Sequence, residues 1–169
     1  YDVAFYAGQP PTSNLICRKL TRDRFCMVAS RDYLQHHGYP KKPRDLRRHQ
    51  CLIYSQGPHP DVWHIKDSVG QEQLIQVHGQ LKSDNPQALC QAAIAHAGIA
   101  MLPCRVVAQA ITYHQLLPIL SDYHLAPIDV YLLYPHRQHL SKKVRLFVDF
   151  LVKFFSDNET TSTLLSHDN

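Results

Sequence analysis

The sequence predicts an α/β fold, because short apolar strands alternate with helices of amphipathic spacing. The alternation is clearest over residues 81–110, where a helix, an apolar strand and a second helix follow one another. Near the end of the chain, an apolar and aromatic strand over residues 128–134 precedes a helix that Ser141 is expected to cap. The apolar stripe of that helix consists of Val144, Phe147, Val148, Leu151, Phe154 and Phe155.

The first half of the chain predicts more strands than helices. Ser30 is suited to cap a short helix that stops at Gly38, and the polar, proline-containing residues 40–49 are expected to form a loop with at most one helical turn. Trp63 belongs to a predicted hairpin, where aromatic residues usually pack across strands, so we expect it in the core or on the lobe surface rather than in a ligand site. We expect strands at residues 3–5, 15–29 and 51–54 and the hairpin over residues 58–79, with its turn at Gly70.

Composition places the chain among ordinary globular proteins. Of its 169 residues, 44% are hydrophobic and 19% are charged, and no apolar run approaches the roughly 18–20 residues that a membrane helix needs. The net charge of +4 is spread along the chain, which favours a solvated surface over a nucleic-acid patch. The first residues carry no basic segment or cleavage site, so we expect no secretion signal and a fragment that begins inside a strand. The five cysteines are odd in number and form no CxxC pair, which favours a reducing cytoplasm.

Residues suited to catalysis or metal binding are few. The chain has only two glutamates, Glu72 and Glu159, and contains no GxSxG, P-loop or CxxC motif. His136 and His139 are spaced as HxxH, but this pair has no acidic partner and no helical register, and His36-His37 are merely adjacent. The sequence does not exclude a catalytic Cys–His pair whose two residues meet only in the folded chain. We therefore expect no enzyme, no metal and no cofactor.

Six short segments of the sequence, taken in order along the chain, form a set. They are YDVAFYAG (1–8), CMVASRDYL (26–34), PRDLRRHQCL (43–52), LKSDNPQALCQAAIAHAGIAMLP (81–103), QLLPILSDY (115–123) and IDVYLLYPHRQHLSKKVRLFVDFL (128–151). In order and spacing the set resembles the sensor domains of LysR-type bacterial transcription regulators. The family often has Arg where Tyr6 stands, Pro where Arg31 stands and Gly where His96 stands.

The resemblance implies a type-2 periplasmic-binding-protein-like fold: two α/β lobes joined by crossover strands, with a small effector in the cleft between them. Residues 25–117 would form the second lobe. Residues 1–24 and 118–156 would form part of an incomplete first lobe, together with the crossover strands. Residues 128–155 would then pack with residues 1–7. Residues 157–169 would be a flexible tail. The whole regulator would form a homodimer or homotetramer, bind promoter DNA only through an N-terminal helix-turn-helix absent from this chain, and need no membrane.

Candidate effector contacts are polar residues at predicted strand ends. Ser83, Asp84 and Asn85 precede a helix that is expected to end at Gly98, and the free N–H groups and dipole of such a helix favour an anion. The alternative is that Ser83 or Asp84 only caps the helix; we expect Asp84 to cap it while Ser83 and Asn85 contact the effector. The other candidate contacts, which would otherwise be plain strand ends, are Tyr6, Tyr54 and Ser55.

Two function classes follow from these observations. The first is the effector-sensing and oligomerisation domain of a DNA-binding transcription regulator, which binds a small anionic metabolite. The second is a solute-binding protein of a transporter with the same fold, against which the absent secretion signal and the unpaired cysteines count.

Overall fold

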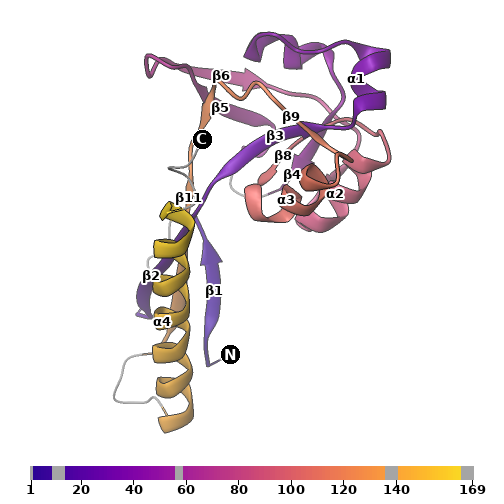
Figure 1. The fold of residues 1–169 in the computed structure, drawn as a ribbon. Coiled ribbons are helices and arrows are strands. Elements are labelled where there is room, and N and C mark those ends of the chain that lie inside the picture. The colour runs from indigo at the N-terminus through magenta and orange to yellow at the C-terminus, as the bar shows by residue number, and fades with distance from the viewer. Residues whose placement is uncertain (1, 9–13, 56–58, 136–140, 165–169) are drawn as a thin grey trace. The chain divides into compact units, whose positions relative to one another are not determined.

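The computed structural model describes residues 2–8, 14–55, 59–135 and 141–164, with side chains up to residue 156. The chain divides into two compact units (Figure 1). Unit 1 comprises Tyr1–Asp23 and Ile128–Asn169, and unit 2 comprises Arg24–Pro127. The chain therefore leaves unit 2 at Pro127 rather than at residue 117.

Unit 1 is a three-stranded antiparallel sheet with one helix packed against it. The strands β1 (Ala4–Ala7), β11 (Ile128–Tyr134) and β2 (Ile16–Asp23) lie in that order, and α4 (Lys142–Leu164) runs along the sheet (Figure 1). The pairing of β1 with β11 confirms the expected contact between the last strand and the first residues. The core of this unit consists of Leu20, Leu132, Tyr134, Val148 and Leu151.

Asp129 of β11 forms ion pairs with two basic residues of β2 on the surface of unit 1. The carboxylate of Asp129 accepts a hydrogen bond from Arg22 at 2.8 Å and lies 2.7 Å from the Lys19 ammonium. These two cations lower the pKa of Asp129 to about 2, so the carboxylate is ionised at neutral pH.

Unit 2 is built on a five-stranded mixed sheet in the order β7-β4-β8-β3-β9. The strands β7, β4 and β8 run parallel, whereas β3 is antiparallel to β8 and β9. A separate hairpin, β5–β6, is extended by β10. In chain order the elements are β3 (Phe25–Ala29), α1 (Arg31–His37), η1 (Pro43–Arg48), β4 (Cys51–Tyr54), β5 (Val62–Lys66), β6 (Glu72–Gln76), β7 (Lys82–Ser83), α2 (Pro86–Ile94), β8 (Ile99–Pro103), α3 (Cys104–Thr112), β9 (Leu117–Ile119) and β10 (His124–Leu125).

The sheet of unit 2 is buried on both faces. Successive strand residues point to opposite sides, and each side packs into its own core. Leu52 and Ala100 lie on the face that α2 and α3 cover (Figure 1). Cys51 and Ile53 lie on the other face, against α1, η1 and the hairpin. Trp63, whose side chain is 1% exposed, is part of this second core, one of the two places that its hairpin position allowed. No helix in the described ranges of the chain is long and apolar enough to cross a membrane.

The end of α2 differs from the sequence-based expectation. The helix ends at Ile94 rather than at Gly98, because His96 adopts a φ of 65°, in the left-handed region that favours glycine. Gly98 instead allows the chain to approach Gln50, whose carbonyl accepts the backbone N–H of Ile99 at 2.9 Å. A side chain at residue 98 would overlap that carbonyl.

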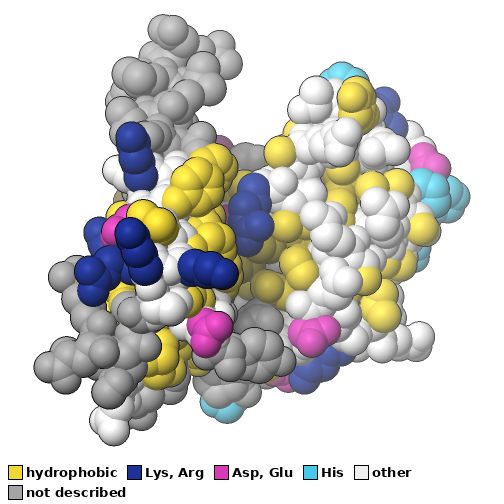
Figure 2. Space-filling model, turned by 90° about the horizontal axis from the view of Figure 1, so that it is seen from below, with side chains coloured by type: hydrophobic (Ala, Val, Ile, Leu, Met, Phe, Trp, Pro, Cys, Tyr) yellow, Lys and Arg dark blue, Asp and Glu magenta, His cyan; other side chains and the backbone are white. Residues whose placement is uncertain are grey.

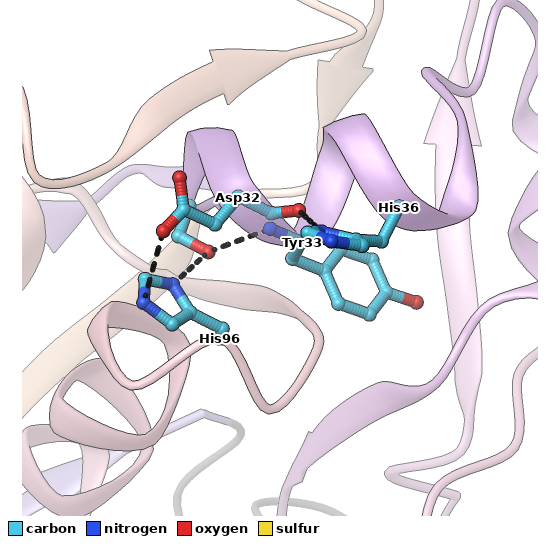
Figure 3. Close-up of polar contacts among 5 residues, drawn as sticks. Asp32, Tyr33, His36 and His96 are labelled. Atoms are coloured by element: carbon cyan, nitrogen blue, oxygen red, sulfur yellow. Dashed lines mark hydrogen bonds and ion pairs between the residues drawn. The ribbon is translucent and has the colours of Figure 1, made fainter.

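The imidazole of His96 joins the end of α2 to the start of α1 (Figure 3). Its Nδ1 lies 2.9 Å from Oγ of Ser30, which is 1% exposed and also accepts the backbone N–H of Tyr33 as the cap of α1. Its Nε2 lies 3.3 Å from Oδ2 of Asp32, a contact between half-exposed side chains that is an ion pair only when the imidazole is protonated. Exposed pairs of this kind contribute about 0.2–1 kcal/mol, so the contact with buried Ser30 is the stronger anchor.

Substitution of His96 separates its backbone strain from its side-chain contacts. His96→Ala loses both ring contacts and keeps the left-handed φ, so its free energy of unfolding should fall by about 1–2 kcal/mol. His96→Gly loses the same contacts but relieves the strain, so it should be about 1 kcal/mol more stable than His96→Ala. Urea denaturation measures both changes, and equal stability of the two variants would show that the φ of His96 carries no cost.

Candidate functional site

The predicted contact residues of unit 2 lie at the carboxyl ends of two neighbouring parallel strands. Tyr54, at the end of β4, pairs with Ser83, at the end of β7. The backbone N–H of Ser55 donates to the carbonyl oxygen of Ser83 at 2.9 Å, so the pairing continues one residue beyond the strands. Ligands of open α/β folds bind at such carboxyl ends. The structure therefore brings Tyr54, Ser55 and Ser83 together on adjacent backbones.

Asn85, rather than Asp84, caps the helix that follows. Its side-chain oxygen accepts the backbone N–H groups of Gln87 and Ala88 at 3.0 and 3.2 Å. The expectation that Asp84 is the cap is therefore wrong. The sequence held the decisive signal, because a proline at the first helical position, here Pro86, marks the residue before it as the cap.

The backbone donors at the start of α2 are already occupied. Gln87 and Ala88 donate to Asn85, Leu89 donates to the carbonyl oxygen of Asn85 at 3.3 Å, and Pro86 has no N–H. A ligand here would thus meet side-chain donors and the helix dipole rather than free backbone N–H groups. The suggestion of unpaired backbone donors is wrong for this helix.

Side chains around the two strand ends retain hydrogen-bonding capacity. The Oγ of Ser83 accepts the backbone N–H of Asn85 at 3.0 Å, which leaves the hydroxyl proton of Ser83 for another acceptor. The amide of Asn85 uses its oxygen for the cap and keeps two N–H donors. Ser55 adds a hydroxyl group beside Tyr54, and both residues are half-buried. Together these groups can bind a small polar or anionic molecule.

The two tyrosines among the predicted contacts, Tyr54 and Tyr6, lie in different units. The ring of Tyr54 packs against Phe25 at the start of β3, with 6.4 Å between the ring centroids, a neighbour that the sequence did not indicate. Tyr6 belongs to unit 1, where it pairs with Tyr131 and its side chain is 38% exposed. The four residues of unit 2 therefore form one local constellation, and Tyr6 lies in the other unit.

A basic hollow lies elsewhere in unit 2, at η1. Its volume is about 510 Å³. Asp45 accepts the backbone N–H of Lys42, which lowers the pKa of its carboxyl, and the nearby Arg44 and Arg48 lower it further. Small-molecule pockets are mostly apolar with few polar groups, so this charged hollow is not the better effector site. The residues that line it are Arg44, Asp45, Arg47 and Arg48.

The histidines of α1 make contacts within that helix. His36 Nδ1 lies 2.8 Å from the carbonyl oxygen of Asp32, and His37 stacks on Tyr33 with 4.3 Å between centroids. Within the part of the chain that the structure describes, no three His, Cys, Asp or Glu side chains gather as metal ligands would. His136 and His139 lie outside the described residues.

Comparison with known proteins gives the family. The family model described as the LysR substrate binding domain matches residues 1–156. The chain belongs to this family. The Escherichia coli transcriptional regulator DmlR is 31% identical over 158 residues, which cover 93% of this chain and 51% of that protein. An uncharacterized HTH-type transcriptional regulator of Haemophilus influenzae is also 31% identical, over 85% of this chain and 50% of its own length.

Solved structures of LysR-type regulators have the same fold. Full-length AphB of Vibrio cholerae, a virulence activator, matches with a TM-score of 0.79 at 31% identity, over 92% of this chain and 52% of its own. The CrgA regulatory domain of Neisseria meningitidis matches with a TM-score of 0.78 at 26% identity, over 91% of this chain and 75% of that domain. The protein thus has the periplasmic-binding-protein-like fold of LysR effector-binding domains, which confirms the fold predicted from sequence.

The relatives also separate the two function classes. They are transcriptional regulators rather than enzymes or transporter components, so the solute-binding alternative is not favoured. The chain spans about half the length of the curated relatives it matches. It is the effector-binding domain of a LysR-type regulator.

The cap of α2 can be tested by two neighbouring substitutions. Asn85→Ala removes both side-chain bonds to the helix and should lower the free energy of unfolding by about 0.5–2 kcal/mol. Asp84→Ala, in which an exposed side chain is shortened, should change it by less than about 0.5 kcal/mol. Thermal and chemical denaturation compare the variants. A larger loss for Asp84→Ala would restore Asp84 as the cap.

Proposed function

We propose that this domain senses a small carboxylate-bearing metabolite through Ser83, Asn85, Tyr54 and Ser55, for a cytoplasmic regulator that binds promoter DNA through a separate N-terminal module. The observation that carries this proposal is the parallel pairing of β4 with β7, which gathers hydroxyl and amide groups at two strand ends beside the start of a helix. The family supplies the regulatory role.

An anionic effector suits this location for electrostatic reasons. The start of α2 carries the positive end of the helix dipole, and each favourable anion contact there contributes roughly 0.3–1 kcal/mol. Hydrogen bonds from Ser83 and Asn85 to a carboxylate would add about 1.5–3 kcal/mol each. Asp84 has an exposed side chain, and orientation toward solvent would keep its negative charge from the bound anion.

Promoter-bound regulators of this class act as assemblies, and we propose that α4 contributes to one. Its outer face exposes Leu146 (62%), Phe147 (48%), Phe150 (61%) and Phe154 (51%), and Phe150 stacks on Phe154 with 6.0 Å between centroids. Figure 2 shows hydrophobic side chains beside Lys and Arg side chains on the surface of unit 1. Exposed apolar patches rimmed by charge are typical of protein–protein contacts, and a second copy of this chain is the partner we propose, in a homodimer or homotetramer.

The effector site is tested with Ser83→Ala in the full-length regulator. A panel of small mono- and dicarboxylates, screened by thermal shift, should contain a compound that stabilises the wild-type protein. Loss of one charge-assisted hydrogen bond should weaken binding of that compound about 10- to 100-fold in calorimetry.

Promoter binding without effector should stay at the wild-type level in Ser83→Ala, because Ser83 lies in the sensing domain. Asp84→Asn is the matched control on the next residue and should bind the compound at least as tightly as the wild type, because it removes a like charge. Unchanged affinity of Ser83→Ala for the stabilising compound would exclude Ser83 as a contact.

Self-association is tested with Phe150→Glu. A charge on the exposed stripe of α4 should shift the protein toward monomer in sedimentation velocity, because the charge would have to be desolvated in the contact. Val69→Glu is the control, since Val69 is 85% exposed at the hairpin turn of unit 2. A wild-type chain that stays monomeric at high micromolar concentration contradicts the proposal.

A further inference from the structure

Two cysteines of unit 2 lie on the same face of its sheet, on neighbouring strands. Cys26 pairs with Leu102 across the antiparallel β3–β8 ladder. The ladder continues one step further, because the backbone N–H of Cys104 donates to the carbonyl oxygen of Arg24 at 2.8 Å. Cys26 and Cys104 are therefore diagonal neighbours. Cys26 packs on the side of the sheet that α2 and α3 cover, and because Cys104 follows Leu102 by two residues, strand alternation puts it on the same side.

The two thiols are in contact. Hydrogen bonding between the Cys26 and Cys104 side chains raises the pKa of Cys26, and burial raises it further. Cys26 therefore keeps its proton at neutral pH. The same thiol lies 3.9 Å from the carbonyl oxygen of Leu102, a weaker partner.

The surroundings give the two sulfurs different roles. Cys104 is the first residue of α3, where the helix dipole favours an anionic sulfur. The proton of Cys26 is available to donate to that sulfur. Cys104 is thus placed as the nucleophile, and Cys26 as the thiol that resolves its oxidised form.

Accessibility separates this pair from the other three cysteines. Cys26 and Cys104 are half-buried, whereas Cys51 and Cys90 are 0% and 3% exposed. Cys17 is exposed but belongs to unit 1. A small oxidant can therefore reach two neighbouring thiols at one place in unit 2.

We propose that Cys26 and Cys104 form a reversible disulfide when the protein meets a hydroperoxide. The Cys104 sulfur attacks the terminal oxygen of the hydroperoxide, so that an S–O bond forms and the O–O bond breaks; the leaving oxygen takes up the proton of the Cys104 thiol and departs as an alcohol, or as water from hydrogen peroxide. The sulfur of Cys26 then attacks the resulting sulfenic acid; the S–S bond forms, and the displaced hydroxide leaves as water with the Cys26 proton. Two thiols lose two electrons in total, and one hydroperoxide is reduced. A dithiol returns the pair to its reduced form.

The position of the pair suggests what the bond would change. Cys26 follows closely on the boundary between the units at Asp23 and Arg24, and its neighbour Phe25 packs on Tyr54 of the proposed effector site. Diagonal partners are about 7–8 Å apart at Cα and disulfides about 4.4–6.8 Å, so oxidation would draw the first turn of α3 toward β3. We expect the bond to alter effector response, a consequence that rests on the proposed function, whereas formation of the bond does not.

The bond is tested by peptide mapping of the full chain after stoichiometric hydrogen peroxide, without reductant. Trypsin should release residues 25–31 joined to residues 83–105. Because the second peptide contains both Cys90 and Cys104, the linkage is assigned with Cys90→Ser, which should keep the cross-link, and Cys104→Ser, which should lose it. In Cys26→Ser, a sulfenic-acid probe should label Cys104. Where a serine variant does not fold, native alkylation of the wild-type protein should show Cys26 and Cys104 protected together after peroxide.

Three outcomes would overturn the proposal: a cross-link to Cys90, oxidation confined to Cys17, or Cys26 and Cys104 both free after peroxide. The functional consequence is read separately, as effector affinity of the oxidised and reduced regulator. Cys17→Ser is the control, because it keeps the pair and should respond like the wild type. A cross-link that forms without changing effector affinity would refute the regulatory consequence and leave the site itself established.

Discussion

β4 pairs in parallel with β8 on one side and with β7 on the other, and a strand in that position has to bury both of its faces. Cys51, Leu52 and Ile53 meet this requirement with side chains that are at most 4% exposed. Since β4 and β7 run in the same direction, their ends reach the same edge of the sheet. The location of the proposed effector site depends on this arrangement more than on any single polar residue.

Local patterns were sufficient to predict most of unit 2. α1 begins after Ser30 and ends before Gly38, as the capping preferences of these two residues indicate. The alternation of apolar and polar residues around Trp63 corresponds to the expected hairpin. The short strands β9 and β10 could not be assigned by pattern, because two or three residues carry no periodicity. They belong to unit 2 through pairing with β3 and β5, which only the folded chain reveals.

The candidate site could be predicted in outline but not in detail. Strand ends and a capped helix placed Tyr54, Ser55 and Ser83 at one edge, as observed. Pro86 marked Asn85 as the cap, but the identity of the cap does not by itself show which backbone donors its side chain occupies; in the folded chain both Gln87 and Ala88 donate to it. His96 is a similar case: the contact of its imidazole with Ser30 joins two elements that are distant in the sequence, which no local rule anticipates.

Amide hydrogen exchange of the full-length regulator, with and without the compound that stabilises it, tests the location of the effector site most directly. Binding should slow exchange at Ser55 and over residues 83–89, with little change at the hairpin turn around Gly70. Protection centred on the basic hollow at Arg44–Arg48, with residues 83–89 unchanged, would contradict it and would place the effector on the other side of the sheet of unit 2.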